Sequence, residues 1–139
     1  MYITLECDYA VRIVSCLAIE EKRLDAKTIS DMTSVTLRFS LKILRKLVSG
    51  GIVKSYKGTF GGYELAKPLE EMSLLDVVET IEGKYQLSRC LEEGYPCSRG
   101  ASGSCAYQRA FKELTDVVRG ALSQKTFADL VPIEKQNRK

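Results

Sequence analysis

Residues 40–68, SLKILRKLVSGGIVKSYKGTFGGYELAKP, change their hydrophobic period partway along. The first part has apolar residues at helical spacing, which predicts a helix over about residues 36–48 that ends at the glycine pair 50–51. The second part reads as IVKSY and YELA around the glycine-rich turn KGTFGG, which predicts a two-stranded β-hairpin. A hairpin directly after such a helix is typical of a wing, so the segments around it should complete a winged fold.

Two further helices are predicted upstream. The first covers residues 5–21, and its apolar face is formed by Tyr9, Ile13, Cys16 and Leu17. The second covers residues 26–32 and is joined by the tight connection TSV to the helix at 36–48. Together these segments predict a helix-turn-helix followed by a wing.

Downstream of the hairpin, Ser73 is placed to cap a helix, SLLDVVETIEG, that ends at Gly83. Glycines and a proline then exclude regular structure from most of the segment up to residue 105. Residues 106–123 carry a heptad seam, formed by Tyr107, Phe111, Leu114, Val118 and Ala121. The seam is shorter than about three heptads, so two interpretations remain open: a helix packed on its own domain, or a helix that pairs with a second copy.

The predicted fold class is mainly α with a small β-hairpin wing, organised as a winged helix-turn-helix domain plus a long dimerisation helix. The predicted boundaries are 1–83 for the winged domain with its wing at about 52–66, 84–105 for a cysteine-bearing loop, 106–131 for the dimerisation helix and C-terminal segment, and 132–139 for a polar tail.

The composition is that of a soluble globular protein. The 139 residues are 45% hydrophobic and 28% charged, and no apolar run approaches the ~20 residues that span a bilayer. The N-terminal MYITLECDYAVR has acidic residues where a signal peptide has a basic region, so we expect a cytoplasmic protein with no membrane partner. Net charge is only +3, yet residues 32–63 contain six basic residues and no acidic one. Such a local positive surface suits DNA phosphates.

In a helix-turn-helix the second helix enters the major groove with its N-terminal residues against base edges. Arg38 can reach a guanine in bidentate fashion, while Arg45 and Lys46 are better placed for phosphates. The predicted DNA-contacting residues are Thr36, Arg38, Phe39, Lys42, Arg45, Lys46, Ser55, Lys57, Gly58, Thr59, Gly61 and Gly62. The alternatives are a solvated basic face and a protein-interaction adaptor built on the same scaffold.

Three of the five cysteines lie in CLEEGYPCSRGASGSC, residues 90–105, and the chain contains no histidine. In a reducing compartment, clustered thiols suit a metal or a redox switch better than a disulfide. Three soft thiolates at Cys90, Cys97 and Cys105 fit an iron-sulfur cluster or zinc, either of which takes about four protein ligands. A bare thiol switch and a structural role remain alternatives. An enzyme with a cysteine nucleophile lacks support, because no histidine is present as a base.

The segments DYAVRIVSCLA, SLKILRKLVSGGIVKSYKGTFGGYELAKP and SLLDVVETIEG, followed by the three-cysteine loop, resemble the Rrf family of bacterial winged-helix regulators, the group that includes IscR and NsrR. The resemblance covers nearly the whole chain in the same order. It implies a homodimer that binds a palindromic operator in double-stranded DNA and holds an iron-sulfur cluster, 2Fe–2S or 4Fe–4S. It also implies that the protein senses nitric oxide, redox or iron-sulfur status; a cluster-free regulator responsive to thiol oxidation or a partner protein is the alternative.

The fourth ligand is where this chain departs from part of that family. IscR-like members use a histidine just after the third cysteine, but here the segment is CAYQR. The resemblance to the NsrR-like branch implies Asp8, supplied by the other subunit, with Cys7 and Glu6 as weaker candidates. A structural role is the competing interpretation for Asp8, since an acid suits the first helical turn and Arg12 at i+4 offers it an ion pair.

Overall fold

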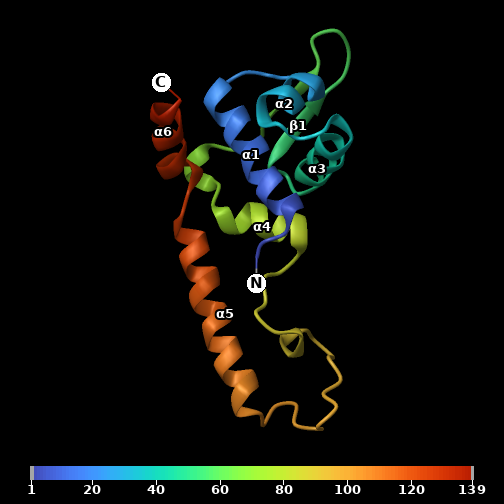
Figure 1. Cartoon of the computed structure of the whole chain (residues 1–139), viewed down its shortest axis with the longest axis vertical. Helices are drawn as coiled ribbons and strands as arrows, with labels where there is room; N and C mark the ends of the chain where they lie inside the picture. Colours follow the sequence, from blue (N-terminus) through green and yellow to red (C-terminus); the bar gives the residue numbers. More distant parts are fainter. Residues whose placement is uncertain (1, 139) are drawn as a thin grey trace.

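A computed structural model of the chain describes residues 2–138 (Figure 1). Its elements are α1 (Leu5–Glu20), α2 (Ala26–Thr33), α3 (Leu37–Ser49), β1 (Val53–Tyr56), β2 (Gly62–Leu65), the 3-10 turn η1 (Leu69–Glu71), α4 (Leu74–Glu82), the 3-10 turn η2 (Arg89–Leu91), α5 (Ala106–Gln124) and α6 (Phe127–Asn137). The helices predicted from the sequence agree with these bounds to within one residue at each end, and the predicted hairpin is present. The fold class, mainly α with a small hairpin wing, is confirmed.

Helix α1 lies at the centre of the head, the part of the molecule formed by α1 to α4, the wing and α6. Helices α2, α3, α4 and α6 and strand β2 all pack against α1. Helix α3 is held to this core by Ile43, Leu44 and Leu47, which are fully buried. Burying a side chain of this size contributes ~1.5–3 kcal/mol, so the orientation of α3 on the head is strongly determined.

The wing is tied to the segment between α1 and α2. Strands β1 and β2 pair antiparallel, with Val53 opposite Leu65 and Tyr56 opposite Gly62. Leu24 adds a short edge to this sheet by exchanging two backbone hydrogen bonds with Tyr63, of 3.0 and 2.8 Å. A Cβ on Gly62 would lie 2.7 Å from the Leu24 carbonyl oxygen, so only glycine allows the approach.

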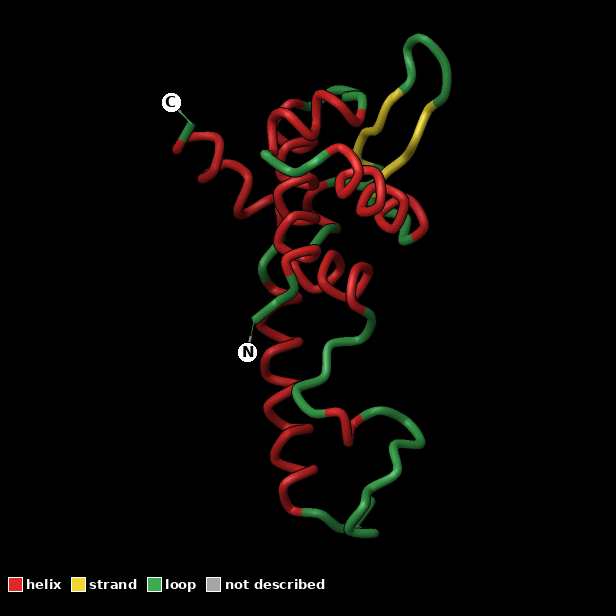
Figure 2. Tube along the Cα trace, turned by 45° about the vertical axis from the view of Figure 1, so that its right-hand side comes forward, coloured by secondary structure: helices red, strands yellow, loops and turns green. Residues whose placement is uncertain are grey.

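Helix α5 projects from the head and carries the cysteine loop at the end of the molecule opposite the wing (Figures 1 and 2). Polar contacts on one side of α5 hold it in place. The buried Thr115 hydroxyl accepts a 3.0 Å hydrogen bond from the Leu87 amide. Arg119 donates two hydrogen bonds, of 2.9 and 2.8 Å, to the carboxylate of Glu79 on α4.

The Arg119–Glu79 pair makes stability depend on pH. Hydrogen bonds from Arg119, and then from the Tyr85 amide, hold the pKa of Glu79 below its ordinary value of 4.5. A carboxyl whose pKa is lower in the folded state stabilises the fold above about pH 4.5, and this contribution is lost as the pH falls through the folded-state pKa. Glu79→Gln should therefore flatten the acid limb of the pH profile of stability. The free energy of unfolding, measured with urea, should fall less in this variant as the pH is lowered. Asp116→Asn, which breaks the exposed Lys112–Asp116 pair, is the control and should leave that limb nearly unchanged.

The C-terminal segment differs from the sequence prediction. Residues 132–139 were expected to form a polar tail, and residues 106–131 a dimerisation helix with its extension. Instead, α6 begins after the Thr126 cap, continues through Asn137 and packs on the head, with Phe127 and Val131 buried in the core. Pro132 inside the helix and the polar residues after it concealed the pattern, because two buried anchors are too few for a clear periodicity. Lys139 lies outside the described residues.

Candidate functional site

The predicted recognition helix α3 begins at a turn that fixes its orientation. Thr36 is the cap residue, and its hydroxyl accepts a 3.2 Å hydrogen bond from the Phe39 amide. Ser34 takes a left-handed conformation, with φ of 59°, at the end of α2. Ser30 donates to the Val35 carbonyl and closes the turn. The cap and the turn therefore place the first half of α3 on the surface of the head.

The predicted DNA-contacting residues divide into two groups by exposure. The exposed residues are Thr36, Arg38, Lys42, Arg45, Ser55, Lys57, Gly58 and Thr59, and the half-buried residues are Phe39, Lys46, Gly61 and Gly62. Phe39 packs edge-on against Tyr9 of α1, with ring centroids 5.5 Å apart. Lys46 pairs with Glu6 at 2.7 Å, so its charge is already partly neutralised. Both residues thus contact α1, which the sequence did not reveal.

Arg38 and Arg45 are different, because within residues 2–138 neither has a carboxylate partner within 4.0 Å. Lys42 makes a long 3.7 Å contact with Glu6, and its Nζ lies 5.7 Å from the centroid of the Phe39 ring. An unpaired guanidinium on an exposed helix face is available for a phosphate or a base edge. The available positive charge of α3 therefore lies along its exposed side.

The wing tip, residues 57–60, is exposed and carries one basic and one aromatic side chain. Phe60 is 89% exposed, and Lys57 lies three residues before it. Gly58 has a φ of +91°, and a Cβ on Gly61 would clash with the Tyr56 carbonyl oxygen. Gly58 and Gly61 are therefore required by the turn itself. Phe60 was not among the predicted site residues. Its position as the one aromatic residue in the glycine-rich turn KGTFGG is the signal that could have identified it.

A three-residue clamp, Arg23, Tyr56 and Glu64, lies at the base of the wing. The Arg23 guanidinium carbon lies 3.3 Å from the centroid of the Tyr56 ring, and Nε is 3.4 Å from Glu64 Oε2. The Tyr56 hydroxyl donates a 2.7 Å hydrogen bond to Glu64 Oε1. This bond is the main cause that raises the pKa of Tyr56 and lowers that of Glu64. The clamp joins both strands of the wing to the loop after α1.

Arg23→Ala should lower DNA affinity several-fold with little change in melting temperature. The substitution removes the stacking and the ion pair that orient the wing, and it leaves the buried core intact. Fluorescence anisotropy with a labelled duplex measures the affinity. Lys22→Ala, which removes an exposed positive charge next to Arg23, is the control; an equal loss in that variant would mean that only net charge matters.

The three loop cysteines are partly exposed free thiols. Cys90 Sγ lies 3.1 Å from Ser88 Oγ, and Cys105 is the residue before α5. Backbone amides, first that of Ala101 and then that of Arg99, lower the pKa of Cys97. Gln108 spans the loop by donating to the Cys90 carbonyl at 2.9 Å and accepting from the Gly103 amide at 3.2 Å.

The structure does not gather these thiols into one ligand set. In the part of the chain that it describes, no three cysteine or carboxylate side chains come together in a group able to hold a metal ion. Asp8 instead pairs with Arg12 at 3.0 Å on α1. Three soft thiols still match the donor chemistry of an iron-sulfur cluster, so a cluster would require the loop to close.

The weaker ligand candidates do not fit. Cys7 is completely buried, and burial raises the pKa of its thiol to about 11, assisted by Glu82, Asp8 and Glu6. Glu6 is already paired with two lysines of α3. Cys16 is buried, as predicted, with its sulfur 3.8 Å from that of Met32. Neither Cys7 nor Glu6 is free to reach a cluster.

Most of the heptad seam of α5 is exposed. Tyr107 is 68%, Phe111 38% and Leu114 50% exposed, and the neighbouring Val117 is 67% exposed. The buried residue of α5, Thr115, lies on the side that faces the loop. The head therefore leaves these seam residues uncovered, whereas Val118 is half-buried.

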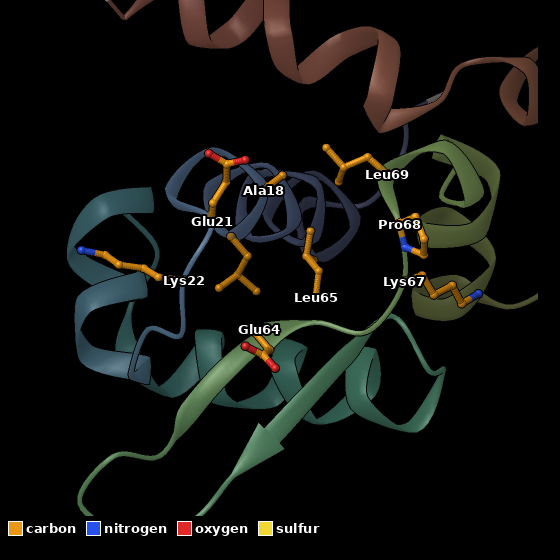
Figure 3. A pocket seen from close by; sticks show the side chains of 9 residues that line it. Ala18, Glu21, Lys22, Glu64, Leu65, Lys67, Pro68 and Leu69 are labelled. Atoms are coloured by element: carbon orange, nitrogen blue, oxygen red, sulfur yellow. The ribbon is translucent and has the colours of Figure 1, made fainter.

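A hollow of about 260 Å³ lies behind the wing, between the end of α1, β2 and η1 (Figure 3). Leu17 and Leu65 are among its lining residues, and the charged ends of Lys22 and Lys67 point away from its middle. A ligand site needs polar groups that converge on the ligand. This hollow is therefore no candidate site.

A capped recognition helix with an exposed basic face, followed by a glycine-turned wing, defines a DNA-binding protein of the winged helix-turn-helix class. No helix among residues 2–138 is long and apolar enough to cross a membrane. The chain belongs to the Rrf2 family, described as iron-dependent transcriptional regulators, whose sequence profile matches residues 3–133. It is a transcriptional regulator, and the prediction that it is not an enzyme is confirmed.

Relatives of known name agree with this assignment. The chain is 28% identical over 134 residues to the transcriptional regulator NsrR of Shouchella clausii, covering 94% of this chain and 89% of that protein. The fold is similar to that of CymR, the global cysteine regulator of B. subtilis, with a TM-score of 0.76, 23% identity, and coverage of 96% and 98% of the two chains. It is also similar to IscR of T. potens, with a TM-score of 0.75, 18% identity, and coverage of 100% and 92%.

Proposed function

We propose that the protein binds a palindromic operator as a homodimer and that an iron-sulfur cluster tunes its affinity. Cys90, Cys97 and Cys105 would hold the cluster together with Asp8 of the partner subunit. Bound there, the cluster would supply a centre that reacts with nitric oxide or oxidants. The observation that carries the proposal is the placement of three partly exposed thiols beside an apolar helix seam that is open to a second copy.

The seam on α5 supports the proposed homodimer. Three large apolar side chains of the seam, Tyr107, Phe111 and Leu114, are exposed along one helix, and the neighbouring Val117 is exposed beside them. Pairing two such seams would place two heads on one DNA duplex. Two heads related by a twofold axis match a palindromic operator, because the two half-sites of such an operator are related by the same symmetry.

The cysteine loop can take part in such an assembly. Gly94, Gly100 and Gly103 have positive φ angles, so the loop is built from turns and not from packed elements. Asp8 lies on α1 of the head, while the thiols lie at the far end of α5 (Figure 1). A second copy is therefore the source of Asp8 that the proposal requires.

Anaerobic purification with quantification of iron and acid-labile sulfide tests the cluster. We expect a coloured protein whose affinity for DNA changes when the cluster is removed by a chelator. A colourless protein without iron or sulfide would contradict the cluster. If that protein then lost DNA binding after mild peroxide treatment and regained it with a reductant, the thiol-responsive alternative would be supported, with Cys97 as the thiol of lowered pKa.

Arg38→Ala tests DNA reading by α3. Arg38 is exposed and unpaired near the start of the helix, so its loss should weaken specific binding by about 1–3 kcal/mol and relax the base preference. The comparison uses a duplex enriched from a random library and a scrambled duplex. Arg45→Ala is the matched variant and should weaken both duplexes alike and reduce the salt slope by about one. Binding insensitive to salt would instead favour the adaptor alternative.

A further inference from the structure

Two leucines lie on the exposed side of the recognition helix. Leu37 is 41% exposed and Leu41 is 40% exposed, although α3 buries four other residues in the head. The two are four positions apart, so they share one face of the helix. A single exposed leucine is ordinary, but this pair is aligned along the face that the proposed function directs at DNA.

The surroundings of the leucines are basic. They line a shallow hollow together with Thr36, Arg38, Phe39, Lys42 and Arg45. No acidic residue contributes to that lining within the described chain. An apolar strip flanked by three cations suits a polyanion that also displays apolar groups. Duplex DNA has both properties, whereas a neutral protein groove has no charge for the cations to bind.

The major groove displays one apolar group, the C5-methyl of thymine. Along an α-helix, four residues span ~6 Å, and two base-pair steps span ~7 Å. Leu37 and Leu41 are thus spaced to meet methyl groups about two base pairs apart. Arg38, next to Leu37, could read a guanine between or beside them.

We propose that Leu37 and Leu41 contact thymine methyl groups, so that each operator half-site requires thymine at two positions close to the base pair read by Arg38. This inference rests on the proposed function and adds the base identity that the operator must contain. It also assigns a recognition role to two residues that are not among the DNA-contacting residues predicted from the sequence.

The test replaces thymine with uracil, which removes the methyl group and keeps the base pair. A duplex enriched from a random library by the wild-type protein is the probe, and each thymine is replaced in turn. We expect affinity to fall about fourfold at two thymines of each half-site, the effect of one buried methyl group. With Leu41→Ala, one of these penalties should disappear and the other persist, and Leu37→Ala should give the reciprocal result. Leu41→Met, which keeps an apolar side chain, should retain both penalties.

The outcomes separate the two proposals. If the wild type enriches a sequence but no uracil substitution weakens binding, or if both penalties persist in both alanine variants, the leucine assignment is overturned while DNA binding stands. If no sequence is enriched, both proposals fail. Circular dichroism melting of the alanine variants confirms that the head remains folded, as expected for half-exposed side chains.

Discussion

Leu114→Glu should convert the protein to a monomer and lower operator affinity by about 10²–10⁴-fold. Leu114 is 50% exposed at the middle of the α5 seam, between Phe111 and Val118. In a symmetric pairing the two introduced carboxylates would lie in an apolar contact, where burying a charge is strongly unfavourable. Without the second head, the protein would lose the advantage of a second binding event on the same duplex.

Sedimentation analysis gives the oligomeric state, and binding to duplexes with one and with two half-sites gives the affinities. Ser123→Glu is the control, because it adds the same charge at an exposed position nine residues on, half a helical turn away at ~100° per residue. The variant with Glu at position 114 should bind both duplexes equally. An unchanged dimer with unchanged operator affinity would show that the seam is not the dimer contact.

Cys97→Ala should abolish the cluster, and Asp8→Ala should make it labile. Surrounding backbone amides lower the pKa of Cys97, which favours the thiolate form that binds iron. Asp8 would provide an oxygen donor, which holds iron less firmly than thiolate. Iron and sulfide content of anaerobically purified variants, followed over time in air, measures both effects.

Two matched variants separate ligation from general damage. Asp31→Ala breaks the Lys27–Asp31 pair on α2, which has the same i,i+4 form as the Arg12–Asp8 pair. Cys16→Ala removes a buried thiol of the core. Both variants should keep wild-type iron and sulfide. Wild-type retention in Asp8→Ala would exclude Asp8 as an essential ligand, and retention in Cys97→Ala would exclude the loop site.

Local patterns predicted the helices and the wing well. Helical spacing of Ile43, Leu44 and Leu47, together with the glycine pair after them, located α3 and its end correctly. The helix cap at Ser73 was predicted for the same reason, since its hydrogen bond joins residues three positions apart. Signals of this kind depend on neighbours along the chain, and these are visible in the sequence.

Long-range contacts were not predictable in this way. The packing of Phe39 on Tyr9 and the pairing of Lys46 with Glu6 join segments about thirty or more residues apart, so both residues were assigned to DNA when they also support the core. The Arg23 clamp on the wing has the same origin. Helix α6 was missed because its two buried anchors, Phe127 and Val131, show their role only against the head.

By itself, the sequence determined the order of the elements, the wing, the basic stretch at residues 32–63 and the presence of three clustered thiols, because periodicity, glycine positions and charge are local properties of the chain. Only the tertiary structure decided which of the basic residues are free, that the α5 seam is exposed, that Leu37 and Leu41 face outward, and that the thiols lie at the end opposite the wing (Figure 1). These properties depend on which surfaces the packed core covers, and burial is set by contacts between distant segments.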